Sequence, residues 1–243
     1  FAVKVKKNQT AQIQNSEDAE ELRKLSLHLS HLNLDVLSKE EKTIFWIDIF
    51  NALVINTFLK LEKSPTNIWE WKYLERTAYY TIGGVAYSLW DIHHGILRHN
   101  KPSPGGTDLP FYDSDPRLAI LKQVCYFPGI LFALSNHTKY SPSVFRLEAS
   151  SINSGVRQAT TLFCQNSISI EGRKLKIPIL LKEYFSDLQQ GEYDEEKLLL
   201  FVKDHLSSVQ RKALEMIQHS PDFELEWVQN WSPSAKVLVG YVQ

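Results

Sequence analysis

The stretch FWIDIFNALVINTFLKL (residues 45–61) decides the fold, because it has the length and composition of one long helix that must be buried. Apolar residues occur on almost every side of the expected helix. Three polar side chains interrupt the run: Asp48, Asn51 and Asn56. Asp48 and Asn51 are three residues apart and share one face of a helix, whereas Asn56 points elsewhere.

Polar side chains in a buried helix need partners, because each one left without a hydrogen bond costs on the order of 1–3 kcal/mol. Two interpretations are open: they bind the backbone of a buried loop, or they hold a catalytic or ligand-binding group in place.

The limits of the helix are clearer. Ser38 and Glu41 form an S-x-x-E capping box and Pro65 lies beyond the end, so we predict a helix over residues 39–62.

Length and composition favour one globular domain: the chain has 243 residues, of which 43% are hydrophobic. Its 27 basic and 28 acidic residues give no positive field for nucleic acid, so we expect no nucleic-acid partner. No run of 18 uncharged apolar residues predicts a membrane span, and no signal peptide opens the chain. We expect an intracellular protein, with secretion as the alternative because sequons begin at Asn8 and Asn136.

The segments around the central helix mix helices with hairpins, which predicts an α+β fold with a buried central helix on a mainly antiparallel sheet. The expected elements, in chain order, are an amphipathic helix capped by Ser16, a hairpin turning at Gly83-Gly84, a buried strand GILFALS (129–135), a helix over 152–165 capped by Ser151, a hairpin turning at Gly172, two helical segments within 194–218, and strands in DFELEWVQNW (222–231) and KVLVGYV (236–242). We assign residues 1–34 to an N-terminal extension and helix, and residues 35–243 to the domain.

A second polar cluster lies in SLWDIHHGILRH (residues 88–99), where Ser88 and Asp91 form a capping signal for a short helix. Asp91, His94 and Arg98 are spaced i, i+3 and i+7, which places a carboxylate, an imidazole and a guanidinium along one stripe of an α-helix. His93 is expected to face about 100° away from His94.

Four blocks together resemble the DUF547 family, a domain of unknown function found in plants, bacteria, nematodes and protists. The blocks are FWIDIFNALVINTFL, GGVAYSLWDIHHGILR, DPR and FALSNHTKYSPSVF, in this order over roughly residues 35–190. The family pattern matches Trp46, Asn51, His94, Arg98, Asp115, Arg117, Ser141 and Pro142. Because some members are fused to glutaredoxin and DEP domains, the resemblance implies a module of larger proteins.

Departures from the family pattern fall at the positions that matter for chemistry. Asp48 stands where the family usually has Asn, and His93 stands where it usually has Glu. Asn136 and Ser141 stand where many bacterial members have cysteines. The resemblance therefore does not carry a thiol nucleophile over to this chain.

An enzyme hypothesis uses Ser141 as nucleophile, His94 as general base, Asn51 or Asp48 as the orienting group, and Arg98, Arg117 and Asp115 as binding residues. Such a hydrolase or acyltransferase would be loosely papain-like or transglutaminase-like. The segment KYSPS lacks the G-x-S-x-G elbow of serine hydrolases, and Ser-Pro is also good turn chemistry. Because Asn51 matches the family motif, the resemblance implies that it faces the place where His94 and the Ser141 loop converge, with or without catalysis.

The favoured hypothesis is a protein-interaction or scaffolding domain, a possible pseudoenzyme that belongs to a larger protein or assembly. The replaced residues at 93, 136 and 141 favour it, and aromatics in NIWEWKYLERTAYY (67–80) offer contact surface. Any small-molecule ligand is left open.

Metal binding is a third interpretation, since Asp91, His93, His94 and His99 crowd one helix. The adjacent histidines are expected to point apart and no H-x-x-x-H pair occurs there, so we predict no metal site. Cys125 and Cys164 have no redox or zinc spacing. The glycine pairs suit turns and not phosphate loops, so we also expect no cofactor.

Overall fold

The computed structural model describes residues 16–61, 65–189 and 191–229. Its α-helices are α2 (Glu17–His28), α3 (Lys39–Leu61), α4 (Ile68–Thr77), α5 (Ile152–Ser167), α6 (Leu180–Glu183), α7 (Phe185–Leu188), α8 (Glu195–His205) and α9 (Ser208–Ile217). Shorter helical turns are η1 (Leu29–His31), η2 (Asp91–Leu97), η3 (Pro116–Gln123), η4 (Ile130–Ala133) and η5 (Ala149–Ser151).

The strands form two small sheets instead of one. A hairpin pairs β1 (Tyr79–Ile82) with β2 (Val85–Ser88), turning at the predicted glycine pair, which has positive φ angles. The second sheet has the order β3-β4-β5, with β3 (Ser169–Glu171) antiparallel to β4 (Lys174–Pro178) and β5 (Glu224–Val228) parallel to β4. The α+β class is confirmed, and the predicted strand at 236–242 lies outside the described residues.

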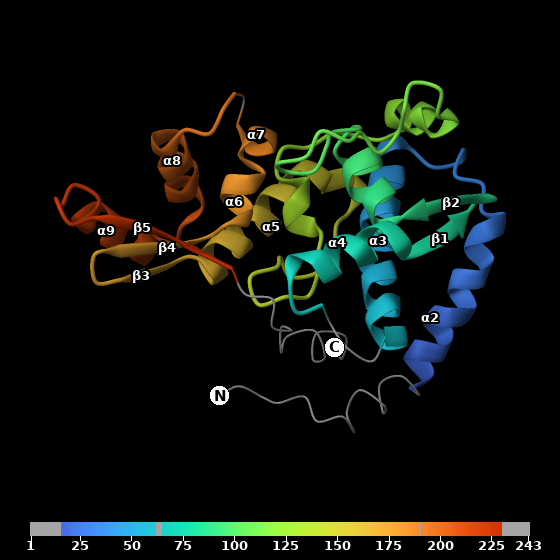
Figure 1. Cartoon of the computed structure of the whole chain (residues 1–243), viewed down its shortest axis with the longest axis horizontal. Helices are drawn as coiled ribbons and strands as arrows, with labels where there is room; N and C mark the ends of the chain where they lie inside the picture. The colour runs from blue at the N-terminus through green and yellow to red at the C-terminus, as the bar shows by residue number, and fades with distance from the viewer. Residues whose placement is uncertain (1–15, 62–64, 190, 230–243) are drawn as a thin grey trace.

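The two sheets lie at opposite ends of the molecule (Figure 1). The β1–β2 hairpin lies beside α2 and α3 at one end, and β3, β4 and β5 lie beside α8 and α9 at the other. Each end has its own hydrophobic cluster, one centred on α3 and η2 and the other on α5, β4 and α8. Buried residues of η4 and α5 belong to both clusters, so these two elements join them.

Helix α3 is the buried centre of the first cluster, as predicted. The capping box at its start is present: the Ser38 amide donates to the Glu41 carboxylate over 2.8 Å, and the Glu41 amide donates to Ser38 Oγ over 3.2 Å. By length and hydropathy α3 is also the one helix in the described residues that matches a membrane span, a test that core helices of globular proteins pass as well. Asn51 and Asn56 are buried, whereas Asp48 is exposed.

The predicted buried strand over 129–135 is wrong. This segment is buried, but it forms the 3₁₀ turn η4, entered through Gly129 at φ +84°. A short continuous apolar run does not distinguish a buried strand from a buried helical turn. Strand pairing would require a neighbouring edge, and here α5 packs against η4 instead.

Candidate functional site

A pocket of about 140 Å³ lies beside α4 and η2, where the two ends of the molecule meet. Polar side chains from four segments line it: Glu75 on α4, His94 on η2, Ser103 after it, and Asn136, Thr138 and Tyr140 in the loop that follows η4. Its remaining walls come from α4, from residues 178–184, and from the end of β5. We call it the histidine pocket.

The carboxylate of Glu75 is the centre of the histidine pocket. Its Oε1 lies 3.2 Å from Nδ1 of His93 and 3.3 Å from Nε2 of His94, and all three residues are buried. Burial alone would raise the pKa of Glu75, but the hydrogen bonds of the two imidazoles, and their positive charge once acid protonates them, outweigh burial and hold that pKa well below its usual range. Glu75 is therefore an ionised carboxylate that fixes two histidine rings.

His94 has both of its ring nitrogens occupied. Nη1 of Arg98 lies 2.6 Å from Nδ1, and a guanidinium can only donate, so Nδ1 is the acceptor. Nε2 must then carry the proton that points at Glu75. Burial, with smaller contributions from His93 and Arg98, lowers the pKa of His94 to about 4. The ring is neutral at neutral pH and has no lone pair to offer a substrate.

Arg98 is held from several sides. Its Nε pairs with the carboxylate of Asp187, and its Nη1 also donates to the carbonyl of Pro102 over 2.7 Å. Lys101 adds a second cation to Asp187, with Nζ 2.8 Å from Oδ1. Arg98 and Asp187 are both buried. The additional hydrogen bonds from Lys101 and to Pro102 help to offset the cost of removing the two charges from water.

The geometry of η2 explains why the histidine rings lie together. Hydrogen bonds in η2 run from Arg98 N to His93 O and from Asn100 N to Gly95 O, the i to i+5 pattern of a π-helix. The His93 and His94 rings are stacked with centroids 4.2 Å apart, so the prediction that they point apart is wrong. It assumed α-helical geometry, whereas π-turns are widened and occur frequently at functional sites.

Asp91 lies outside this network, so the predicted stripe of Asp91, His94 and Arg98 is not formed. Its carboxylate accepts from the Ser88 amide and hydroxyl, which confirms the capping signal. It also lies 3.1 Å from Nη1 of Arg117, which in turn pairs with Asp115. Arg117 and Asp115 therefore secure the start of η2 and η3, away from His94.

Asn51 follows the first interpretation of the polar residues in α3. Its Nδ2 donates to the carbonyl of Ala133 over 2.9 Å, and its Oδ1 accepts from the amide of Ser135 over 2.9 Å. Asn51 thus pairs with one backbone carbonyl and one backbone amide, on the two sides of Leu134, where η4 ends. Asn56 donates to the hydroxyl of Tyr80 over 3.0 Å, and Asp48 is solvent-exposed.

Ser141 is bound within its own loop. Its Oγ accepts from the Asn136 amide over 2.9 Å and lies 3.1 Å from Oγ of Ser135. No hydrogen bond joins Ser141 to His94 within the described residues, and Asn51 does not orient the imidazole. The structure does bring the loop to the pocket, but it presents Asn136, Thr138 and Tyr140 there instead.

The donor set Glu75, His93 and His94 has ligand atoms within 4.8 Å of one another, which is close enough for a metal ion. The hydrogen bonding opposes this use. Because Arg98 occupies Nδ1 of His94, the proton on Nε2 blocks the atom that faces the other two donors. Only Glu75 and His93 remain, fewer than the three protein ligands of a catalytic zinc site.

Sequence reasoning missed two residues of the network, Glu75 and Asp187. Glu75 is one of two acids on α4, and Asp187 lies 89 positions from the arginine that it pairs with. No spacing signal links either of them to His94 or Arg98. Only their burial distinguishes them from surface carboxylates.

Fold and site together define an α+β domain with a buried carboxylate–imidazole–guanidinium network under a small pocket. The chain belongs to the DUF547 family: residues 34–164, more than half of it, match the family model described as "Protein of unknown function, DUF547". This match covers α3, the histidine pocket's η2 and the loop up to Ser141. No protein with a curated description and no solved structure shows significant similarity to the chain.

Proposed function

We propose that this chain is a protein-interaction domain that docks through one face of α4, and that its histidine pocket is not an acyl-transfer site. The observation that carries the proposal is the composition of this face. Trp69, Lys72, Tyr73 and Arg76 are spaced i, i+3, i+4 and i+7, which places them on one side of the helix. We call them the aromatic–cationic face.

These side chains are exposed although they are of the types that dominate binding energy at interfaces. Trp69 is 76% and Tyr73 is 69% exposed. Neither Lys72 nor Arg76 forms an ion pair with a described carboxylate; Lys72 Nζ lies over the Trp69 ring at 5.7 Å. An acidic partner surface with apolar grooves complements this combination in both charge and shape.

The aromatic–cationic face connects directly to the histidine pocket. Arg76 lies 3.8 Å over the ring of Trp90, and the Trp90 ring lies 4.3 Å from that of His94. The buried, hydrogen-bonded network beneath α4 thus supports the exposed contact surface. Rigid anchors reduce the entropy lost on association.

The alternative, a hydrolase or acyltransferase using Ser141, His94 and Asn51, lacks support at each step. A general base needs a free nitrogen within about 2.6–3.2 Å of the nucleophile. Both nitrogens of His94 are occupied, and the Ser141 hydroxyl is bound in its own loop. The pocket also lacks a thiol, because neither Cys125 nor Cys164 lines it.

Two experiments separate the hypotheses. In the first, the tagged chain is co-purified and the partner is accepted only if it co-elutes at fixed stoichiometry. Trp69→Ala with Tyr73→Ala should abolish this co-elution, whereas Tyr112→Ala, which removes an equally exposed tyrosine elsewhere, should not. Equal behaviour of the two variants contradicts the proposed face.

The second experiment uses a fluorophosphonate probe that reacts with activated serines. We expect no labelling of Ser141 in the folded chain. Labelling that disappears in His94→Gln would instead establish the Ser141–His94 enzyme.

A further inference from the structure

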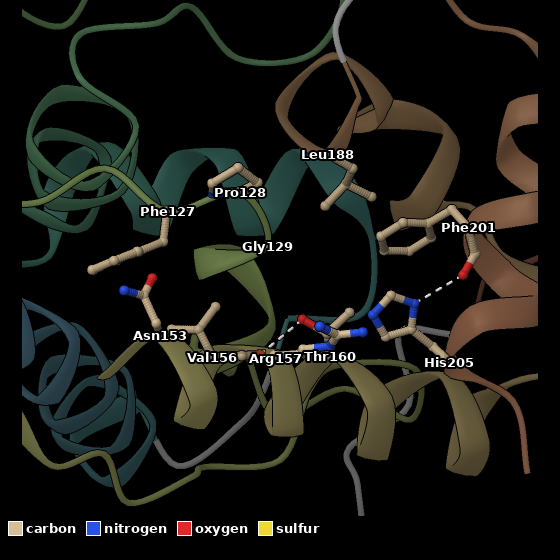
Figure 2. A pocket seen from close by; sticks show the side chains of 10 residues that line it. All are labelled: Phe127, Pro128, Gly129, Asn153, Val156, Arg157, Thr160, Leu188, Phe201 and His205. Atoms are coloured by element: carbon tan, nitrogen blue, oxygen red, sulfur yellow. Dashed lines mark hydrogen bonds between the residues drawn. The ribbon is translucent and has the colours of Figure 1, made fainter. Parts of the chain in front are cut away.

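A second pocket, of about 240 Å³, lies in the other half of the molecule and shares no residue with the histidine pocket. Helices α5, α7 and α8 and the loop before η4 enclose it (Figure 2). Phe127, Val156, Leu188 and Phe201 give it apolar walls. We call it the α5–α8 pocket.

Arg157 of α5 gives this pocket a free positive charge. Its side chain is exposed, and no carboxylate among the described residues pairs with it. No Asp or Glu lines the pocket. A guanidinium is always charged and binds a carboxylate through two parallel hydrogen bonds, so the unpaired Arg157 favours an anionic group.

His205, at the end of α8, contributes an acceptor. Its Nδ1 lies 2.8 Å from the carbonyl of Phe201, and a carbonyl only accepts, so Nδ1 carries the proton. In the neutral ring Nε2 then has a lone pair. Figure 2 shows this nitrogen turned toward the side of the pocket where Arg157 lies. Nε2 of His205 therefore suits an N–H donor of the ligand better than a second anionic group of the ligand.

We propose that the α5–α8 pocket binds an N-acylated amino acid with a large apolar side chain, either free or as the C-terminal residue of a peptide. The carboxylate pairs with Arg157, the acylated N–H donates to Nε2 of His205, and the side chain packs against Phe201 and Leu188. The volume agrees with a single residue, since pockets for drug-sized ligands measure roughly 300–1,000 Å³. This site is separate from the aromatic–cationic face and does not depend on its role.

The test is calorimetric titration of the whole chain with N-acetyl-phenylalanine. N-acetyl-phenylalaninamide, which lacks the carboxylate, should bind roughly tenfold more weakly or not at all. 3-Phenylpropionate keeps the carboxylate and the ring but lacks the acylated nitrogen. It should bind severalfold more weakly than N-acetyl-phenylalanine because Nε2 of His205 gains no donor.

The matching variants are Arg157→Gln and Arg211→Gln. Arg211 is an exposed arginine on α9 that does not line the pocket. Arg157→Gln should weaken binding of N-acetyl-phenylalanine roughly tenfold, whereas Arg211→Gln should leave it unchanged. Both variants should fold, because both arginines are exposed, and thermal unfolding checks this.

Short peptides ending in phenylalanine identify the source of the ligand. Binding of the free-acid peptide but not of its C-terminal amide indicates recognition of a peptide terminus. Binding of N-acetyl-phenylalanine alone indicates a small-molecule site. The proposal is overturned if N-acetyl-phenylalanine does not bind at about 10 mM, if acid and amide bind equally, or if Arg157→Gln has no effect.

Discussion

Nη1 of Arg98 lies 2.6 Å from Nδ1 of His94, so the arginine holds the imidazole in the tautomer whose Nε2 is protonated. The same Nη1 donates to the carbonyl of Pro102, which leaves it no hydrogen for a ligand. His94, which matches the family pattern, is thus held between Arg98 and Glu75. Because its other nitrogen faces Glu75, neither nitrogen of this ring is free to accept a proton from Ser141.

The state of His94 can be read directly by NMR of its imidazole nitrogens. We expect a neutral ring at pH 6, protonated at Nε2, because burial lowers its pKa to about 4. A pH titration of the ¹⁵N shifts measures both properties. A ring that takes up a proton near pH 6.5 or carries its proton on Nδ1 contradicts the assigned hydrogen bonds.

The Arg98–Asp187 pair should respond as a buried ion pair does. Arg98→Met leaves a buried carboxylate with Lys101 as its only cation, and we expect a loss of about 3–5 kcal/mol in the free energy of unfolding. Arg98→Met with Asp187→Asn removes both charges and should recover part of this loss. Urea denaturation of the two single variants and the double variant gives the coupling energy, and additive losses would show that the pair is not coupled.

Asn51 should contribute more to stability than Asn56, although both are buried asparagines of α3. Asn51→Ala leaves a buried carbonyl and a buried amide without partners, at a cost of roughly 2–5 kcal/mol. Asn56→Ala affects only the Tyr80 hydroxyl and should cost about 1–3 kcal/mol. Urea unfolding of the two variants makes the comparison, and an equal loss would argue against the loop-anchoring role of Asn51.

Gly95 is required for the close packing of η2 against Phe111. A Cβ atom at position 95 would lie 2.5 Å from two atoms of that buried ring. Gly95→Ala should therefore destabilise the fold by about 1–3 kcal/mol or more. Gly95→Ala with Phe111→Leu should lose less than the two single variants added together. Thermal unfolding measures the three variants, and strict additivity would exclude the steric explanation.

His137 should make the fold less stable in acid. Burial lowers its pKa from 6.5 to about 4, so between these values the unfolded chain binds the proton more readily than the folded chain. The contribution of the neutral His137 ring to the free energy of unfolding is complete above pH 6.5. It falls by about 2 kcal/mol between pH 7 and pH 5. His137→Asn keeps a residue that tolerates the positive φ of 57° but does not titrate. Urea unfolding at both pH values should show a shallower pH dependence for the variant, and an unchanged slope would contradict this assignment.

Local signals predicted most of the elements. The capping box of Ser38 and Glu41 fixed the start of α3, and glycines with positive φ marked both hairpin turns. These features depend on residues a few positions apart, so the chain alone specifies them. The π-turn of η2 escaped prediction because hydrophobic periodicity does not report a locally widened helix.

The sequence by itself determined the α+β class, the family, the central helix and the fact that its asparagines need partners. The tertiary structure alone decided what those partners are: Asn51 binds the end of η4, Glu75 binds two histidines, and Asp187 binds Arg98. The physical reason is that a hydrogen bond depends on the distance between two atoms in space. Residues 18 to 89 positions apart in the chain lie within hydrogen-bond distance only in the packed fold.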